Sequence, residues 1–170
     1  LQWFINGAKG DGTNKDFVLK GSGSFTIKKY TTLTLTNLNL SNTGSGYIYV
    51  EGTLVIDVNI NIVRLIRLVR VLPGGRVIWK GGNGLGTDIT QEFFYIEDGG
   101  VFEYREGTIS GGEYGFHNDG ILYIYGGNIS GTNYGGYTYS FGTTTIFGGT
   151  VSGGYYNGGK TIISGGTFIG

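Results

Sequence analysis

The sequence predicts an all-β protein built as a parallel β-helix, or β-solenoid, and three observations support this. Four segments near the C-terminus share one pattern, a short alternating strand, a glycine and a further apolar residue: 101–110, 121–130, 143–152 and 160–169. Their shared glycines lie 20, 22 and 17 residues apart, at Gly107, Gly127, Gly149 and Gly166. The segments show strand alternation and no helical pattern. A period near 20 without helices is typical of coils that stack on one another.

Stacking defines which side chains form the core. Coils that lie about 4.8 Å apart place equivalent residues directly above one another. We therefore expect three inward columns: Phe102, Leu122, Thr144 and Thr161; Tyr104, Ile124, Ile146 and Ile163; Ile109, Ile129, Val151 and Phe168. The pattern continues backward more loosely, which predicts about seven coils of roughly 17–25 residues over 25–170. Residues 1–24 are then an N-terminal cap or docking segment.

Composition limits the function classes. The chain has 36 glycines and one proline, but it is also 39% hydrophobic and 15% aromatic, so it differs from disordered chains and the glycines are expected at corners. Twelve basic residues balance twelve acidic ones, so no nucleic-acid partner is expected. There is no cysteine, which excludes disulfides and thiolate metal sites. A flat antiparallel sandwich is the alternative fold, although hairpin strands would not repeat one motif at one period.

The repeats also resemble a known family. "EGTISGG" (106–112), "GGNISGT" (126–132), "GGTVSGG" (148–154) and "SGGTFIG" (164–170) resemble the GGTISGN-type repeats of large bacterial cell-surface proteins with pectin-lyase-like right-handed parallel β-helices. The resemblance covers 75–170 well and 25–75 by strand pattern alone. It implies a right-handed coil and an extracellular or cell-surface location.

A second resemblance lies at the start of the chain. "INGAKGDGTNKD" (5–16) is similar to the N-terminal segment of phage tailspikes and pectate-lyase-type enzymes. That likeness implies a carbohydrate-active module. The family has paired acids and a capping helix after "GDG", whereas this chain continues with "TNKDFVLKGSG".

The segment 61–75, "NIVRLIRLVRVLPGG", repeats arginine at every third position. It is too short to span a bilayer, and its β-branched residues favour strands, so no membrane insertion is expected. Leu54 and Val77 occupy equivalent positions 23 residues apart, so the segment fits as strands of one coil. A short helical insertion over 61–73 is the alternative.

Alternation within this segment predicts an interface. We expect Ile66 and Leu68 to point inward, because the opposite register would place an unpaired arginine in the core. The outward residues are then Leu65, Arg67, Val69 and Val71. An outward aliphatic set predicts a face covered by a neighbouring subunit, another domain or a loop.

Few residues are candidates for catalysis or for metal binding. The one histidine, His117, is expected in a surface turn, and no spacing typical of zinc or of a nucleophile is present, so no metal or cofactor is expected. If the protein is an enzyme, the candidate catalytic residues are Glu103, Arg105 and Glu106, since Glu103 and Arg105 share the outer face of one strand. Solvated ion pairs between coils explain these charges equally well.

Outward tyrosines form the other candidate surface. They lie in successive coils: Tyr123, Tyr125, Tyr137, Tyr139, Tyr155 and Tyr156. Stacked on one face, they would hold sugar rings or partner side chains. Lateral stacking for stability alone is the competing interpretation.

Together these features favour a non-enzymatic, extracellular structural β-solenoid, a filament subunit or adhesin segment that stacks end to end. The segment 161–170 has no polar cap, so its open columns at Ile163 and Phe168 are expected to receive the aromatic start of another copy, Trp3 and Phe4. The expected partners are copies of itself, head-to-tail or lateral, or the rest of a longer surface protein, or a polysaccharide. A lyase, hydrolase or glycan-binding module is the alternative, and ice binding through threonine ladders ranks last because the ladders do not persist.

Overall fold

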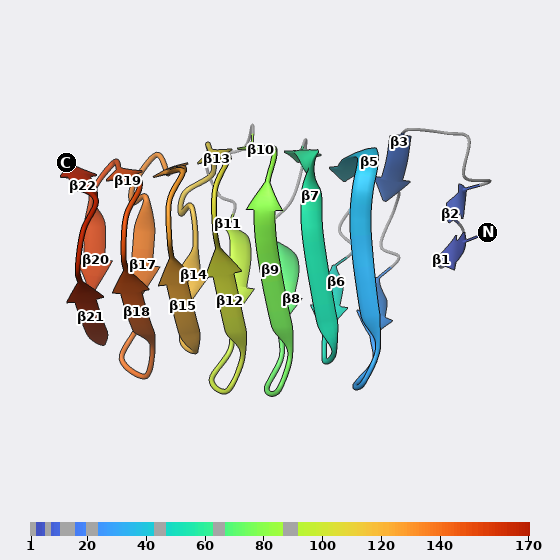
Figure 1. Ribbon diagram of the computed structural model, residues 1–170, viewed down its shortest axis with the longest axis horizontal. Helices are drawn as coiled ribbons and strands as arrows, with labels where there is room; N and C mark the ends of the chain where they lie inside the picture. Colours follow the sequence, from blue (N-terminus) through green and yellow to red (C-terminus); the bar gives the residue numbers. More distant parts are fainter. Residues whose placement is uncertain are drawn as a thin grey trace.

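The computed structural model describes residues 3–5, 8–10, 16–19, 24–42, 47–62, 67–86 and 92–170. In these ranges every regular element is a β-strand, and Figure 1 shows them stacked as an elongated array. Near the N-terminus, β1 (Trp3–Ile5) and β2 (Ala8–Gly10) pair antiparallel. All other pairings are parallel, so the predicted β-solenoid is confirmed and the antiparallel sandwich is excluded for this part of the chain.

Each turn of the solenoid contributes to three faces. The back face is the seven-stranded sheet, formed by β4 (Phe25–Ile27), β6 (Ile48–Val50), β8 (Arg67–Val71), β11 (Glu92–Ile96), β14 (His117–Asn118), β17 (Gly136–Thr138) and β20 (Tyr155–Asn157). The front face contains the first halves of β5 (Thr32–Asn42) and β7 (Thr53–Ile62), then β9 (Arg76–Gly81), β12 (Val101–Tyr104), β15 (Ile121–Ile124), β18 (Thr143–Ile146) and β21 (Lys160–Ile163). Figure 1 shows these strands in front of the back-face strands.

The side face completes each turn. It contains β3 (Asp16–Leu19), the second halves of β5 and β7, β10 (Asn83–Gly86), β13 (Thr108–Ser110), β16 (Asn128–Ser130), β19 (Thr150–Ser152) and β22 (Thr167–Ile169). The front and side faces form one thirteen-stranded sheet, because β5 and β7 run across both. Register shifts after Thr36 and Ile56 mark where these two strands turn from one face to the next.

The three predicted columns are confirmed residue by residue. Phe102 pairs with Leu122, Leu122 with Thr144 and Thr144 with Thr161. The column from Tyr104 to Ile163 and the column from Ile109 to Phe168 follow the same registers. Leu54 and Val77 are also paired, as their spacing predicted.

The repeated glycines form the corners between front and side faces. Gly107, Gly127, Gly149 and Gly166 have φ angles of 101°, 76°, 88° and 97°. At Gly127 a Cβ would lie 2.6 Å from the carbonyl oxygen of Gly107 in the preceding turn. The corner therefore needs glycine both for its backbone conformation and for the close approach of the next turn.

The number of turns and the start of the stack differ from what the sequence predicts. The front and back faces each contain seven strands, but the described stack makes about five complete turns rather than about seven. Segments 43–46, 63–66 and 87–91, which connect successive strands, lie outside the described residues. Parallel pairing reaches into residues 1–24, because β3 pairs with β5. Right-handedness stays a prediction from the resemblance.

The helical alternative for 61–73 is wrong where the segment is described, because residues 53–62 and 67–71 are strands. Residues 63–66 lie outside the described part. Among the described residues there is no helix of the length and apolar character that a membrane span requires.

The core changes character along the stack. In the middle turns it is aromatic: Trp79 packs edge-on against Phe94 with ring centroids 5.5 Å apart, and Phe94 lies 4.5 Å from Phe102. Toward the last turns it becomes polar, since Asn118, Thr138 and Thr144 are fully buried. The Asn118 amide donates to Thr144 Oγ1 at 3.0 Å, and Thr138 Oγ1 lies 2.6 Å from Thr144 Oγ1.

The polar chain continues to the last turn. Tyr155 OH lies 2.6 Å from Thr138 Oγ1 and 2.9 Å from Thr161 Oγ1. Each buried hydroxyl in this chain thus has a partner, as burial requires.

Candidate functional site

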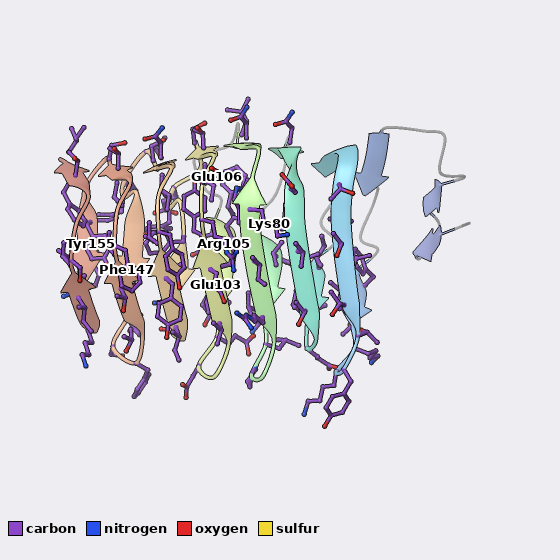
Figure 2. The ribbon with its side chains drawn as sticks, in the orientation of Figure 1. Lys80, Glu103, Arg105, Glu106, Phe147 and Tyr155 are labelled. Carbon is purple, nitrogen blue, oxygen red and sulfur yellow. The ribbon has the colours of Figure 1, made fainter. Side chains whose placement is uncertain are left out.

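The charged residues of the front face form an ion-pair cluster around Glu103. Glu103 on β12 accepts hydrogen bonds from Arg76 on β9 and from Arg105, the latter at 3.1 Å. Burial alone would raise the pKa of Glu103, but the hydrogen bonds and charges of the two arginines outweigh it, and the pKa is lowered. Figure 2 shows Glu103 and Arg105 near the middle of the stack, close to Lys80.

The remaining acid of this region is better exposed. Glu106 lies at the corner after β12, near Gly81 on β9. A Cβ at Gly81 would lie 3.7 Å from Glu106 Oε1 and 3.4 Å from Asp57 Oδ1, so two carboxylates from different turns approach one point. Sequence reasoning named Glu106 and missed Asp57, which lies two turns earlier.

The predicted tyrosine set does not share one face. Tyr123 and Tyr125 lie on the front face with ring centroids 6.3 Å apart, and Tyr125 stacks on Phe147 at 5.1 Å. Tyr137, Tyr139 and Tyr156 lie on the back face. Tyr155 belongs to neither group, because its hydroxyl joins the buried polar chain and its ring packs against the core.

The interface predicted on β8 is wrong for its two valines. Val69 and Val71 are fully buried in the core, where they lie in register with Phe94 and Ile96. Arg70, between them, points outward and pairs with Glu97. Leu65 and the side chain of Arg67 lie outside the described residues, although the backbone of Arg67 is in register with Glu92.

A cluster around His117 on the back face was not predicted. His117 is mostly buried in β14 and not in a surface turn. Its Nδ1 lies 3.0 Å from Glu92 Oε1, and its Nε2 lies 3.8 Å from Asp119 Oδ2. Tyr95 OH donates a hydrogen bond of 2.8 Å to the same Asp119 oxygen. The sequence did not connect Glu92 with the histidine, because the two residues are 25 positions apart.

His117 lies within an aromatic ladder along the back face. The column runs Tyr49, Arg70, Tyr95, His117, Tyr137 and Tyr156, each in register with the next. Ring centroids are 4.8 Å apart for Tyr95 and His117, 5.1 Å for His117 and Tyr137, and 4.4 Å for Tyr137 and Tyr156.

A second row flanks the ladder. Tyr114 and Tyr134 stack with centroids 6.0 Å apart, and both contact Tyr137 edge-on. Burial, followed by the nearby Glu113, raises the pKa of Tyr114 to about 12. Because most ring faces of this surface pack against one another, few faces remain for a sugar to stack on.

The last turn exposes its apolar residues. Ile163 is 57% exposed and Ile169 55%, and Ile162 and Phe168 are also exposed. Strands β20, β21 and β22 each pair on one side only. Trp3 and Phe4 belong to β1, and their side chains lie outside the described part, so their docking to this end stays a prediction.

Among the described residues, no three His, Asp or Glu side chains are grouped so as to hold a metal ion. Comparisons with protein-family models, with curated proteins and with solved structures found no match. The β-solenoid therefore rests on the structure itself, and the likeness to the GGTISGN-type repeats stays a resemblance.

Proposed function

We propose that this protein is a non-enzymatic structural β-solenoid of the extracellular space or cell surface, which associates end to end with copies of itself. The proposal is supported mainly by the free strand edges and the exposed apolar residues of the last turn. Three strands with one free edge each surround exposed Ile163 and Phe168, and free edges with apolar residues are the surface on which a further strand adds.

The opposite end of the stack offers matching edges. Among the described residues, β4 pairs only with β6, and the first half of β5 pairs only with β7. Phe25 and Leu33 are half-buried there and belong to the columns that end at Tyr155 and Thr161. A copy added in parallel, with β4 on β20 and the first half of β5 on β21, would continue the columns of the back and front faces, and β22 would meet β3 on the side face. Head-to-tail contacts of this kind do not close on themselves and produce filaments.

The test is assembly of the purified chain, followed by electron microscopy and sedimentation velocity. We expect concentration-dependent filaments or linear oligomers, and loss of both in Ile163→Lys. The matched control is Leu85→Lys, since Leu85 is also an exposed aliphatic residue but lies on the side face of β10. Monomers at high concentration, or equal effects of the two substitutions, would reject end-to-end stacking.

A carbohydrate-active module is the second candidate, favoured by Asp57 and Glu106. Each has a carboxylate oxygen within 4 Å of the position that a Cβ on Gly81 would take. Glycoside hydrolysis uses two carboxyl groups about 5–9.5 Å apart. Activity against acidic and neutral polysaccharides, compared with Asp57→Asn, Glu106→Gln and the ion-paired Glu103→Gln, tests it. Activity lost only in the first two variants would support this site, whereas no activity in the parent chain would reject it.

A further inference from the structure

The closest aromatic contact on the back face joins two tyrosines of successive turns. Tyr137 on β17 and Tyr156 on β20 are direct register partners. Their rings are nearly parallel, at 10°, with centroids 4.4 Å apart. Tyr156 is 41% exposed, so small oxidants reach the outer ring of the pair.

The composition directs oxidation toward tyrosine. The chain contains no cysteine and no methionine, the two residues that most readily take up oxidising equivalents. Of the two tryptophans, Trp79 is fully buried in the aromatic core, and the side chain of Trp3 lies outside the described residues. Tyr134 and Tyr139 lie within 6.2 Å of Tyr137 or Tyr156, centroid to centroid, so a radical formed on a neighbouring ring has a short path to the stacked pair.

We propose that Tyr137 and Tyr156 are an oxidative modification site that forms an intramolecular dityrosine cross-link between the last two turns. A one-electron oxidant, such as a haem peroxidase supplied with hydrogen peroxide, removes one electron and one proton from each phenol. The two phenoxyl radicals couple through one Cε of each ring, and the hydrogens on those carbons return to the oxygens as the rings regain aromaticity. Two tyrosines lose two hydrogen atoms in total, and one hydrogen peroxide is reduced to two waters.

Geometry selects this pair over the others. Phenoxyl radicals couple when their ring faces approach, which a stacked pair already provides. Tyr114 with Tyr134, and Tyr137 with Tyr139, are also stacked, but their centroids are 6.0 Å apart. The stacked pair of Tyr125 and Phe147 on the front face has only one phenol, so it cannot form the cross-link.

The product would fix β20 to β17 covalently. These strands belong to the end of the stack, where the last turn packs on one neighbour only. The cross-link would add a covalent bond between two strands that are otherwise joined by backbone hydrogen bonds and side-chain packing. The inference holds for the single chain and does not depend on end-to-end assembly.

The experiment treats the purified chain with a haem peroxidase and hydrogen peroxide. We expect dityrosine fluorescence in a product that remains monomeric on a denaturing gel. Trypsin should release residues 106–160 as one peptide, since no Lys or Arg lies between Arg105 and Lys160, and that peptide should have lost two hydrogen atoms. Tandem mass spectrometry should place the link between Tyr137 and Tyr156.

Conservative variants decide the assignment. Tyr137→Phe and Tyr156→Phe should each reduce the dityrosine fluorescence at least tenfold, while Tyr139→Phe should retain it. Phe147→Tyr should create a second link, to Tyr125, by completing a stacked phenol pair. Covalent dimers as the main product, a link at other tyrosines, or full fluorescence in Tyr156→Phe would overturn the proposal.

Discussion

The Nδ1 of His117 lies 3.0 Å from Glu92 Oε1, although the two residues are 25 positions apart in the sequence. Adjacent turns of the back face bring them together, since β11 and β14 pair in parallel. On the other side of the imidazole, Asp119 approaches Nε2 and is itself held by the Tyr95 hydroxyl. The ring is therefore surrounded by two acids and four tyrosines from three successive turns.

This arrangement predicts that Glu92 matters for stability. Glu92 is 8% exposed, and Glu92→Ala would leave buried polar atoms without a partner. We expect a loss of about 1–3 kcal/mol in the free energy of unfolding, measured by urea denaturation. Glu113→Ala is the control, because its contact with the Asn133 amide is exposed, and it should change stability by less than about 0.5 kcal/mol. Equal losses would show that the His117 contact contributes nothing specific.

The columns of the core could be predicted because the repeat itself aligns them. Once Gly107, Gly127, Gly149 and Gly166 are superimposed, the inward residues of the front and side faces in the last four turns follow. The segment 61–73 has no such glycine, so only alternation remained, and alternation allows two registers. The cost of an unpaired arginine in the core favours the register with Arg67 outward. The structure instead buries Val69 and Val71, and places Glu92 beside Arg67 along the stack.

The prediction that the six tyrosines share one face is wrong for a related reason. Tyr155 and Tyr156 are consecutive residues of one strand, so they must point to opposite sides, which the sequence already implied. Which of the two points inward depends on Gly136: a Cβ there would lie 2.3 Å from the Phe116 ring and 2.8 Å from that of Tyr155, so these rings fill its place. No local pattern reveals such compensation between turns.

The buried polar chain predicts coupling between threonines of different faces. Thr138→Val and Thr144→Val each remove one hydroxyl from the contact of 2.6 Å and leave its partner buried. We expect each to cost about 1–2 kcal/mol. The double variant should cost at least about 0.5 kcal/mol less than the two losses combined, because the unsatisfied partner is then absent. Chemical denaturation of the four proteins in this cycle measures the coupling, and strict additivity would contradict a shared hydrogen bond.

The ion-pair cluster on the front face predicts that the stability of the fold decreases at acidic pH. The pKa of Glu103 is below its ordinary value of 4.5 in the folded protein, so its ionised form is favoured by folding. This contribution is present above pH 4.5 and is lost as the pH falls through the lowered value. Since Arg76 and Arg105 are about half exposed, we expect it to be about 0.5–1 kcal/mol.

Glu103→Gln tests this by removing the titrating group. Thermal unfolding of both proteins between pH 7 and pH 3 should give curves that differ most at neutral pH and converge in acid. A constant difference across the range would mean that Glu103 acts through packing alone.

At alkaline pH the buried Tyr104 should limit stability. Burial raises the pKa of its phenol above 10, and the hydroxyl donates a hydrogen bond of 3.0 Å to the Asn128 carbonyl. The neutral phenol is thus favoured by folding below pH 10, and stability falls as the pH rises beyond that value. Tyr104→Phe should cost about 1 kcal/mol at pH 7 through the lost hydrogen bond, yet show a shallower decline between pH 10 and 12. The exposed Tyr125→Phe is the control and should leave both unchanged.

Corner glycines allow backbone strain to be separated from steric clash. Gly74 and Gly127 have similar φ angles, 81° and 76°, but different surroundings. A Cβ at Gly74 meets nothing within 4 Å, whereas one at Gly127 meets the Gly107 oxygen and the Tyr104 ring within 2.9 Å. Gly74→Ala should therefore cost only the strain of a left-handed residue, about 1–2 kcal/mol. Gly127→Ala should cost at least about 2 kcal/mol more, since the turn that contains Gly107 and Tyr104 must then move away from Gly127. Urea denaturation of the two variants measures the difference, and similar losses would show that the turns are spaced loosely enough at this corner to accept a methyl group.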